Sequence, residues 1–214
     1  MITVLMATYQ GRQYLEQQLD TILAQTVPVK ILISDDGSDD GTREMLDNYA
    51  RWYPEQVVLH HRTEHTGGAA GNFFWLMQEA LKDEKNEYIL FSDQDDVWEN
   101  DKVSVMLHRM KVLEKGLGSA CPILLYSDME VVDEELYEIS PSFASYTHQD
   151  PDRSSFAEIL VENQVTGGAS MINRALLTHC AMEPEICCMH DWWIALTASC
   201  FGVIEFMPRV LSKY

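Results

Sequence analysis

The feature that most constrains the fold is an alternation of short apolar runs with amphipathic segments in the first half of the chain. The apolar runs are rich in β-branched residues and span 2–7, 29–34, 56–61 and 87–92. Between them, apolar residues recur at a spacing of three and four, which is typical of helices that bury one face. Strands that alternate with helices favour right-handed crossovers. The chain is therefore predicted to adopt an α/β fold with a mainly parallel sheet flanked by helices.

The second half of the chain has a less regular pattern. The elements predicted there are helices near 101–114 and over 191–200, strands over 124–132 and 167–174, and a polar loop over 141–155. No internal repeat or low-complexity linker separates the two halves. We therefore expect one continuous domain over residues 1–214.

The charge of the chain restricts its partners. Its 214 residues include 15 Lys and Arg against 34 Asp and Glu, a net charge of −19. An acidic surface repels phosphate backbones and anionic headgroups, so nucleic acid is excluded as a partner, whereas a phosphorylated small molecule screened by a cation is compatible. No apolar run approaches the ~20 residues that span a bilayer, and the N-terminus lacks a basic signal region. We expect a soluble, cytoplasmic protein.

Carboxylates follow two of the predicted strands at the point where each strand ends. Asp35 and Asp36 follow the second strand, and Asp93 and Asp95 follow the fourth. Ligands of such sheets bind beyond the carboxyl ends of the strands. Clustered carboxylates raise one another's pKa unless a cation compensates, and Mg²⁺ or Mn²⁺ accepts one or two carboxylates together with phosphate oxygens. The alternative is a capped loop in which Asp96 or Asn100 begins the next helix.

Two other metal sites are weaker hypotheses. Segment 36–47 has calcium-loop residues at several positions, but it lacks the usual bidentate Glu and follows a β-branched run rather than a helix. A strand-to-helix turn, with Asp39 or Asp40 as the cap, is favoured there. A zinc site at His60, His61 and His65 is disfavoured because strand alternation separates the first two and no Cys lies nearby.

Two short segments of the second half carry further candidate residues. Gly167 and Gly168 enter a predicted strand, where paired glycines indicate close approach by a ligand or by another backbone. Asp191 precedes Trp192 and Trp193 at a predicted helix start. It is either an N-cap or a carboxylate beside an aromatic sugar-binding surface, where it can accept a proton from a hydroxyl.

Together, these segments resemble a known enzyme family. MATYQGRQYLEQQLDTILAQT, ISDDGSDDGTREML, FSDQDDVW, VTGGASMINRALL and HDWW are similar to the motifs of inverting family 2 glycosyltransferases of the GT-A fold, and most similar to those of the bacterial rhamnosyltransferase-like branch. The resemblance covers nearly the whole chain, with the motifs in the expected order. It implies a Rossmann-like nucleotide-sugar-binding half at 1–100 and an acceptor-binding half at 101–214.

The resemblance also implies roles for individual residues. Those implied to bind the nucleotide sugar are Thr8, Tyr9, Asp35 or Asp36, Asn72, Asp93, Gly167 and Gly168. Those implied for the other roles are Asp95 and Asp93 as metal ligands, Asp191 as the catalytic base, and His190, Trp192 and Trp193 as acceptor contacts.

The implied reaction moves a sugar from a dTDP- or UDP-sugar, with dTDP-L-rhamnose favoured. The acceptor is a hydroxyl of a cell-surface glycan or of a lipid-linked precursor, the cofactor is Mn²⁺ or Mg²⁺, and the place is the cytoplasm at the inner face of the membrane. Thr66 stands where related sequences often have Asn, and no Arg lies near Gly71. Relatives continue beyond the position of Tyr214 with a basic segment whose His can complete the metal site. The resemblance thus implies a C-terminally truncated chain, with membrane association through the missing segment or the acceptor.

Two alternatives remain from the residues alone. A sugar-nucleotide nucleotidyltransferase also uses carboxylates and Mg²⁺, but it needs a basic Gly-rich loop near the N-terminus, and ATYQGRQ supplies one Arg and one Gly. A non-catalytic calcium- or glycan-binding module would use the acidic loops and the tryptophans without any preference for a nucleotide.

Overall fold

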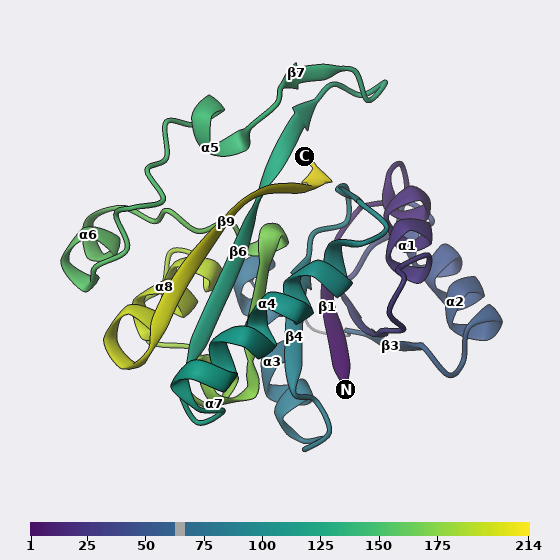
Figure 1. Cartoon of the computed structure of the whole chain (residues 1–214). Coiled ribbons are helices and arrows are strands. Elements are labelled where there is room, and N and C mark those ends of the chain that lie inside the picture. The colour runs from purple at the N-terminus through teal and green to yellow at the C-terminus, as the bar shows by residue number, and fades with distance from the viewer. Residues whose placement is uncertain (63–66) are drawn as a thin grey trace.

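The computed structural model describes residues 1–62 and 67–214, so His65 and Thr66 of the sequence hypotheses lie outside the described residues. The described residues form a nine-stranded sheet with the order β3-β2-β1-β4-β8-β6-β9-β5, and β7 pairs with β6 beyond this path (Figure 1). One sheet thus passes through both halves of the chain.

The first half forms the parallel part of this sheet. Its strands are β1 (Ile2–Thr8), β2 (Lys30–Asp35), β3 (Val57–His61) and β4 (Tyr88–Ser92), and its helices are α1 (Leu15–Leu23), α2 (Thr42–Trp52) and α3 (Ala69–Leu81). β1 pairs in parallel with β2 and β4, and β2 pairs in parallel with β3. The four strands predicted from the apolar runs, and their parallel arrangement, are confirmed.

The second half completes the sheet with mixed pairing. Its strands are β5 (Val97–Trp98), β6 (Ile123–Val132), β7 (Glu138–Ser140), β8 (Ser170–Asn173) and β9 (Val203–Lys213). Its helices are α4 (Lys102–Leu117), α5 (Phe143–Tyr146), α6 (Phe156–Val161), the 3-10 turn η1 (Gly167–Ala169), α7 (Arg174–Cys180) and α8 (His190–Phe201). β8 is antiparallel to β4 and β6, whereas β6 and β9 are parallel.

Two features of this half differ from the sequence prediction. β9 was not predicted, although it pairs with both β6 and β5. Its apolar residues are interrupted by Pro208 and Arg209, which hides the strand pattern. The predicted polar loop 141–155 contains the short helix α5, which begins where Ser142 Oγ accepts a hydrogen bond from Ser145 N.

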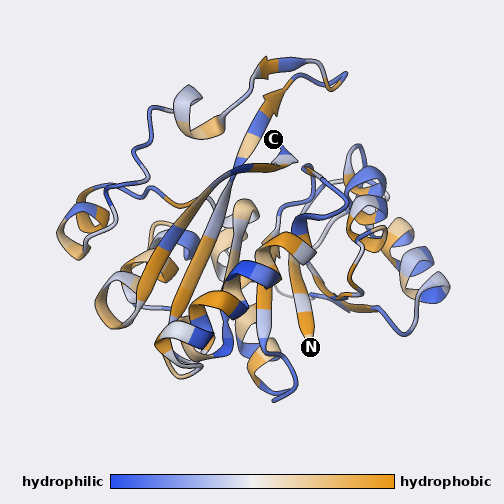
Figure 2. Cartoon of the chain, viewed as in Figure 1, coloured by the Kyte–Doolittle hydropathy of each residue, from blue (hydrophilic) through white to orange (hydrophobic). Residues whose placement is uncertain are grey.

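The hydrophobic core lies on both faces of the sheet. On β1, Val4 and Met6 pack in one cluster with Leu15 of α1, whereas Leu5 packs in the other cluster with Phe73 of α3. Figure 2 shows the strands of the sheet as largely hydrophobic. Sheets with parallel strands are covered on both faces because their crossovers place helices there. The carboxyl ends of the strands therefore remain as the open edge.

Among the helices of the described residues, none combines the length and the apolar character that crossing a membrane requires.

Candidate active site

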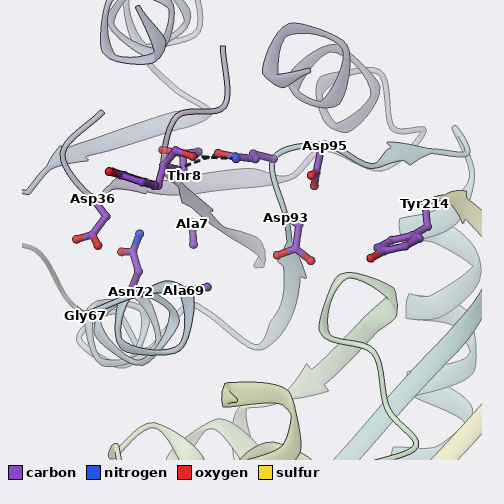
Figure 3. A pocket seen from close by; sticks show the side chains of 12 residues that line it. Ala7, Thr8, Asp36, Gly67, Ala69, Asn72, Asp93, Asp95 and Tyr214 are labelled. Atoms are coloured by element: carbon purple, nitrogen blue, oxygen red, sulfur yellow. Dashed lines mark hydrogen bonds between the residues drawn. The ribbon is translucent and has the colours of Figure 1, made fainter. Parts of the chain in front are cut away.

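A cavity of about 600 Å³ opens at the carboxyl ends of β1, β2 and β4 (Figure 3). The residues that line it are Ala7, Thr8, Tyr9, Asp36, Gly67, Gly68, Ala69, Asn72, Asp93, Gln94, Asp95 and Tyr214. Asp36 and Asn72 lie on one side of the cavity, and Asp93, Asp95 and Tyr214 lie on the other. The structure thus brings together six of the residues predicted to bind the nucleotide sugar or metal, namely Thr8, Tyr9, Asp36, Asn72, Asp93 and Asp95.

The two adjacent aspartates after β2 occupy different environments. Asp35 is fully buried and accepts hydrogen bonds from Ser38 Oγ (2.5 Å), Arg43 Nε (2.8 Å) and Thr8 Oγ1 (3.1 Å). Although burial alone raises the pKa of Asp35, these hydrogen bonds lower it below its usual value. Asp35 therefore holds the turn between β2 and α2, and Asp36 is the aspartate that lines the cavity.

The structure also bears on the other hypotheses for this region. The segment before the 36–47 loop is strand β2, so the helical context of an EF-hand is absent from this described part of the chain. A strand-to-helix turn is present, but the N-cap of α2 is Gly41, so the prediction that Asp39 or Asp40 caps the helix is wrong. Asp40 Oδ1 instead accepts from Thr42 N at 3.0 Å beside the cap. His61 Nε2 lies 2.9 Å from Asp47 Oδ1, and the His60 ring packs against Trp75.

Gln94 connects the ends of β1 and β4, a role that the sequence did not reveal. Its Oε1 accepts from Tyr9 N at 2.9 Å, and its Nε2 donates to Tyr9 O at 3.0 Å. A Cβ at Gly11 would collide with Gln94 Oε1, so a larger residue there would displace the Gln94 side chain. The position of Gln94 between Asp93 and Asp95 is the only sequence signal that pointed to it.

The acidic loop after β4 combines burial with like charge. Burial raises the pKa of Asp93 to about 6, and the neighbouring Asp95 and Asp191 raise it as well. Burial and Asp93 raise the pKa of Asp96 to about 8. Helix α4 begins after Asp101, which acts as its N-cap without a side-chain hydrogen bond. The alternative in which Asp96 or Asn100 caps this helix is therefore wrong.

A buried lysine faces this loop. Lys102 has no exposed surface, donates from Nζ to Gly168 O at 2.7 Å and to Ser212 Oγ at 3.3 Å, and lies 4.1 Å from the centre of the Trp98 ring. Burial lowers its pKa to about 7, against the raising effect of Asp96 and Asp93. Lys102 was not among the residues predicted from the sequence. The available signal was its position one residue before Val103, at the start of the apolar face of α4.

Two carboxylates of the cavity fit a divalent metal. Asp93 and Asp95 both line it, and burial raises the pKa of each carboxyl, as expected for oxygens that lack a compensating cation. Residues 1–62 and 67–214 contain no group of three or more His, Cys, Asp or Glu arranged to hold a metal. Mg²⁺ and Mn²⁺ are commonly bound by one or two carboxylates plus substrate phosphates, so the two aspartates fit such an ion.

The Gly167–Gly168 turn lies between Asp93 and Asp96 on one side and Asp191 on the other. A Cβ at Gly168 would approach Asp96 Oδ2 to 2.7 Å and Asp93 Oδ2 to 3.2 Å. A Cβ at Gly167 would approach His190 Nε2 to 2.9 Å and Asp191 Cβ to 3.4 Å. Both positions thus leave no space for a side chain. The turn separates Asp93 in the cavity from Asp191 at the start of α8.

Asp191 is half-buried and is held by three hydrogen bonds. Its Oδ1 accepts from Trp192 N at 2.6 Å and from Asn163 Nδ2 at 3.2 Å, and its Oδ2 accepts from Gly167 N at 3.2 Å. Burial raises the pKa of Asp191 to about 6, although its backbone hydrogen bonds lower it. The N-cap of α8 is Met189, so Asp191 lies in the first turn rather than at the cap.

The neighbours of Asp191 in sequence, His190, Trp192 and Trp193, differ in their exposure to solvent. His190 is 4% exposed, stacks on Phe73 at 3.9 Å between ring centres, and has its pKa lowered to about 3 by burial. It is thus placed as a neutral packing residue, which does not favour the predicted acceptor contact. Trp192 and Trp193 are half-buried, and Trp192 Nε1 donates to Ile159 O at 2.6 Å.

Comparisons with known proteins agree with this geometry. The family model described as Glycosyl transferase family 2 matches residues 3–177. The chain is 39% identical over 222 aligned residues to the dTDP-rhamnosyl transferase RfbG of Shigella flexneri, covering 97% of this chain and 71% of that protein.

Similar solved structures are more distant in sequence. S. aureus TarS 1-349 in complex with UDP aligns over 100% of this chain with a TM-score of 0.70 at 15% identity. The mannosyltransferase PcManGT from Pyrobaculum calidifontis, in complex with GDP-Man and Mn²⁺, aligns with a TM-score of 0.67 at 18% identity. This chain spans 60% and 56% of those two chains. These structural similarities confirm the GT-A fold. Because the family model matches most of its length, the chain belongs to glycosyltransferase family 2.

Proposed function

We propose that this chain is a metal-dependent, inverting glycosyltransferase domain that transfers L-rhamnose from dTDP-L-rhamnose to a hydroxyl of a cell-surface glycan or lipid-linked precursor. The observation that carries the proposal is the common cavity of Thr8, Asp36, Asp93 and Asp95 in a family 2 chain, with Asp191 beyond its glycine turn. The 39% identity to a dTDP-rhamnosyl transferase supports the choice of donor. The proposed location is the cytoplasm, at the inner face of the membrane.

On the donor side, the two sides of the cavity would bind different parts of the nucleotide sugar. Thr8, Tyr9, Asp36 and Asn72 would surround the base and ribose, at the ends of β1 and β2 and the start of α3. Asp93 and Asp95 would hold Mg²⁺ or Mn²⁺, which supplies positive charge for the diphosphate when bound. Gly167 and Gly168 would lie beside the donor sugar, since a Cβ at Gly168 would lie 3.2 Å from Oδ2 of the cavity residue Asp93.

On the acceptor side, Asp191 acts as the general base. The acceptor oxygen forms a bond to the anomeric carbon as the bond from that carbon to the diphosphate oxygen breaks, and the diphosphate leaves with the electron pair. The hydroxyl proton moves to the Asp191 carboxylate. Attack from the face opposite the leaving group inverts the anomeric centre without a covalent intermediate. The half-buried Trp192 and Trp193 would shape the acceptor side.

The proposal predicts selective stabilisation by nucleotides. We expect dTDP, and more weakly UDP, to raise the melting temperature by about 5 °C or more at saturating concentration with Mn²⁺ present, because a ligand that binds only the folded state stabilises it. GDP and ADP serve as controls for generic diphosphate binding. A shift with Ca²⁺ alone, and none with any nucleotide, would instead favour the binding-module alternative.

The metal role of Asp95 gives a second prediction. We expect Asp95→Ala to weaken Mn²⁺-dependent dTDP binding by about tenfold or more, because a carboxylate that would hold the ion is lost. Isothermal titration with and without Mn²⁺ measures the effect. Asp83→Ala is the matched control, since Asp83 follows α3, outside the cavity, and its carboxylate accepts from Lys85 N at 3.0 Å. Unchanged Mn²⁺-dependent binding in Asp95→Ala would remove Asp95 from the metal site.

A further inference from the structure

The side-chain amide of Asn163 lies in the loop between α6 and the glycine turn, and its orientation is fixed by the backbone. Its Nδ2 donates to Val165 O at 2.8 Å, and its Oδ1 accepts from Val165 N at 3.0 Å. The two ends of the amide meet groups of opposite polarity, so only one orientation satisfies both. The second N–H of Nδ2 then points to Asp191 Oδ1, at 3.2 Å.

Asn163 makes the hydrogen bonding of the Asp191 carboxylate unequal. Oδ1 accepts from Trp192 N and from Asn163 Nδ2, whereas Oδ2 accepts from Gly167 N. Each carboxylate oxygen offers about two lone-pair sites, so both sites of Oδ1 are used and Oδ2 keeps one. Oδ2 is also the oxygen that accepts a hydrogen bond from the Gly167–Gly168 turn, which separates Asp191 from the cavity.

We propose that Asn163 is a positioning residue that makes Oδ2 of Asp191 the proton-accepting oxygen and favours the ionised carboxylate. This inference rests on the proposed role of Asp191 as the base. In the transfer step, the hydroxyl proton moves to Oδ2 while the acceptor oxygen bonds to the anomeric carbon and the diphosphate leaves with the electron pair. Without Asn163, Oδ1 also has a free lone pair and competes for the proton.

The surroundings of Asp191 explain why one neutral donor matters. The titratable groups near it are Asp93 across the turn, Cys187 in the segment before α8, and His190 on its own helix. Asp93 and Cys187 supply no positive charge, and burial keeps His190 neutral by lowering its pKa to about 3. Hydrogen bonds are therefore what favour the charged carboxylate, and removal of one raises the pKa of Asp191.

The experiment measures the titration of Asp191 directly, by ¹³C NMR of protein labelled at the aspartate carboxyl carbons. The Asp191 signal is identified by its loss in Asp191→Asn. We expect Asn163→Ala to raise the pKa of Asp191 by about one pH unit, because a hydrogen bond to the charged form is lost. The isosteric Asn163→Asp should raise it further, because it replaces a donor with a like charge. The affinity for dTDP with Mn²⁺ should stay within about twofold.

Gln164→Ala is the matched control for the loop. Gln164 is buried and its Oε1 accepts from Asp150 N at 2.8 Å, so the variant perturbs the same segment without removing a bond to Asp191. An Asp191 pKa that changes by less than about 0.2 pH unit in both folded Asn163 variants would overturn the proposal. An equal shift in Gln164→Ala would overturn it as well, because loop integrity would then explain the effect. Failure of the base assignment itself is recognised separately, by transfer activity that survives in Asp191→Asn.

Discussion

Asp191→Asn is expected to lower the rate of sugar transfer by about 1,000-fold or more, because general-base catalysis contributes this order of magnitude and an amide cannot accept the proton. Donor binding should be nearly unchanged, since Asp191 lies beyond the Gly167–Gly168 turn and does not line the nucleotide cavity. The measurement is dTDP release from dTDP-L-rhamnose in the presence of lipid-linked saccharides extracted from bacterial membranes. Binding of dTDP with Mn²⁺ is titrated in parallel.

Asp152→Asn provides the control for this substitution. Asp152 also lies in the acceptor half, but its side chain is exposed, so the variant should retain the wild-type rate within about twofold. Transfer by Asp191→Asn at a tenth of the wild-type rate would show that another group removes the proton. Loss of dTDP binding in this variant would place Asp191 on the donor side instead.

The largest effect on stability is expected for Lys102→Met, which should lower the free energy of unfolding by about 3 kcal/mol. The substitution leaves the buried Gly168 carbonyl without its 2.7 Å donor and removes the cation that lowers the pKa of Asp93 and Asp96. Without that cation the pKa of Asp96, which burial already raises to about 8, rises further. A carboxyl whose folded pKa exceeds its unfolded value destabilises the fold increasingly as the pH rises from the unfolded toward the folded pKa. Burial also lowers the pKa of Lys102 to about 7, so the charged lysine costs the wild type more stability near about pH 6 than near about pH 8. Because the substitution removes this cost too, the net loss should be larger near about pH 8 than near about pH 6.

Urea unfolding followed by tryptophan fluorescence measures this loss. Lys111→Met is the matched control, because Lys111 lies on the exposed side of the same helix and should change stability by no more than about 0.5 kcal/mol. Adding Asp96→Asn to Lys102→Met should restore about half of the loss, because the uncompensated carboxyl is then also removed. Equal stability of Lys102→Met and the wild type at both pH values would contradict this account.

Local patterns allowed much of the site to be located in advance. The strand ends at Thr8, Asp93 and Asp95 were predicted because a strand and its end are features of a few adjacent residues, and parallel strands bring such ends to one edge. The direction in which each side chain points could not be predicted in the same way. Asp35 and Asp36 were equivalent in the sequence, and contacts from Arg43, Ser38 and Thr8 decide which one is buried.

The amino-acid sequence alone therefore determined the strand–helix alternation, the family resemblance and the position of the carboxylates at the edge of the sheet. Only the tertiary structure decided that Lys102 is buried under the glycine turn, 66 residues away in sequence, and that Asn163 meets Asp191 across 28 residues. It also decided that β9 lies between β6 and β5. The physical reason is that periodicity and turn preference act between neighbours along the chain, whereas burial, hydrogen-bond partners and pKa depend on residues that packing brings together from distant segments.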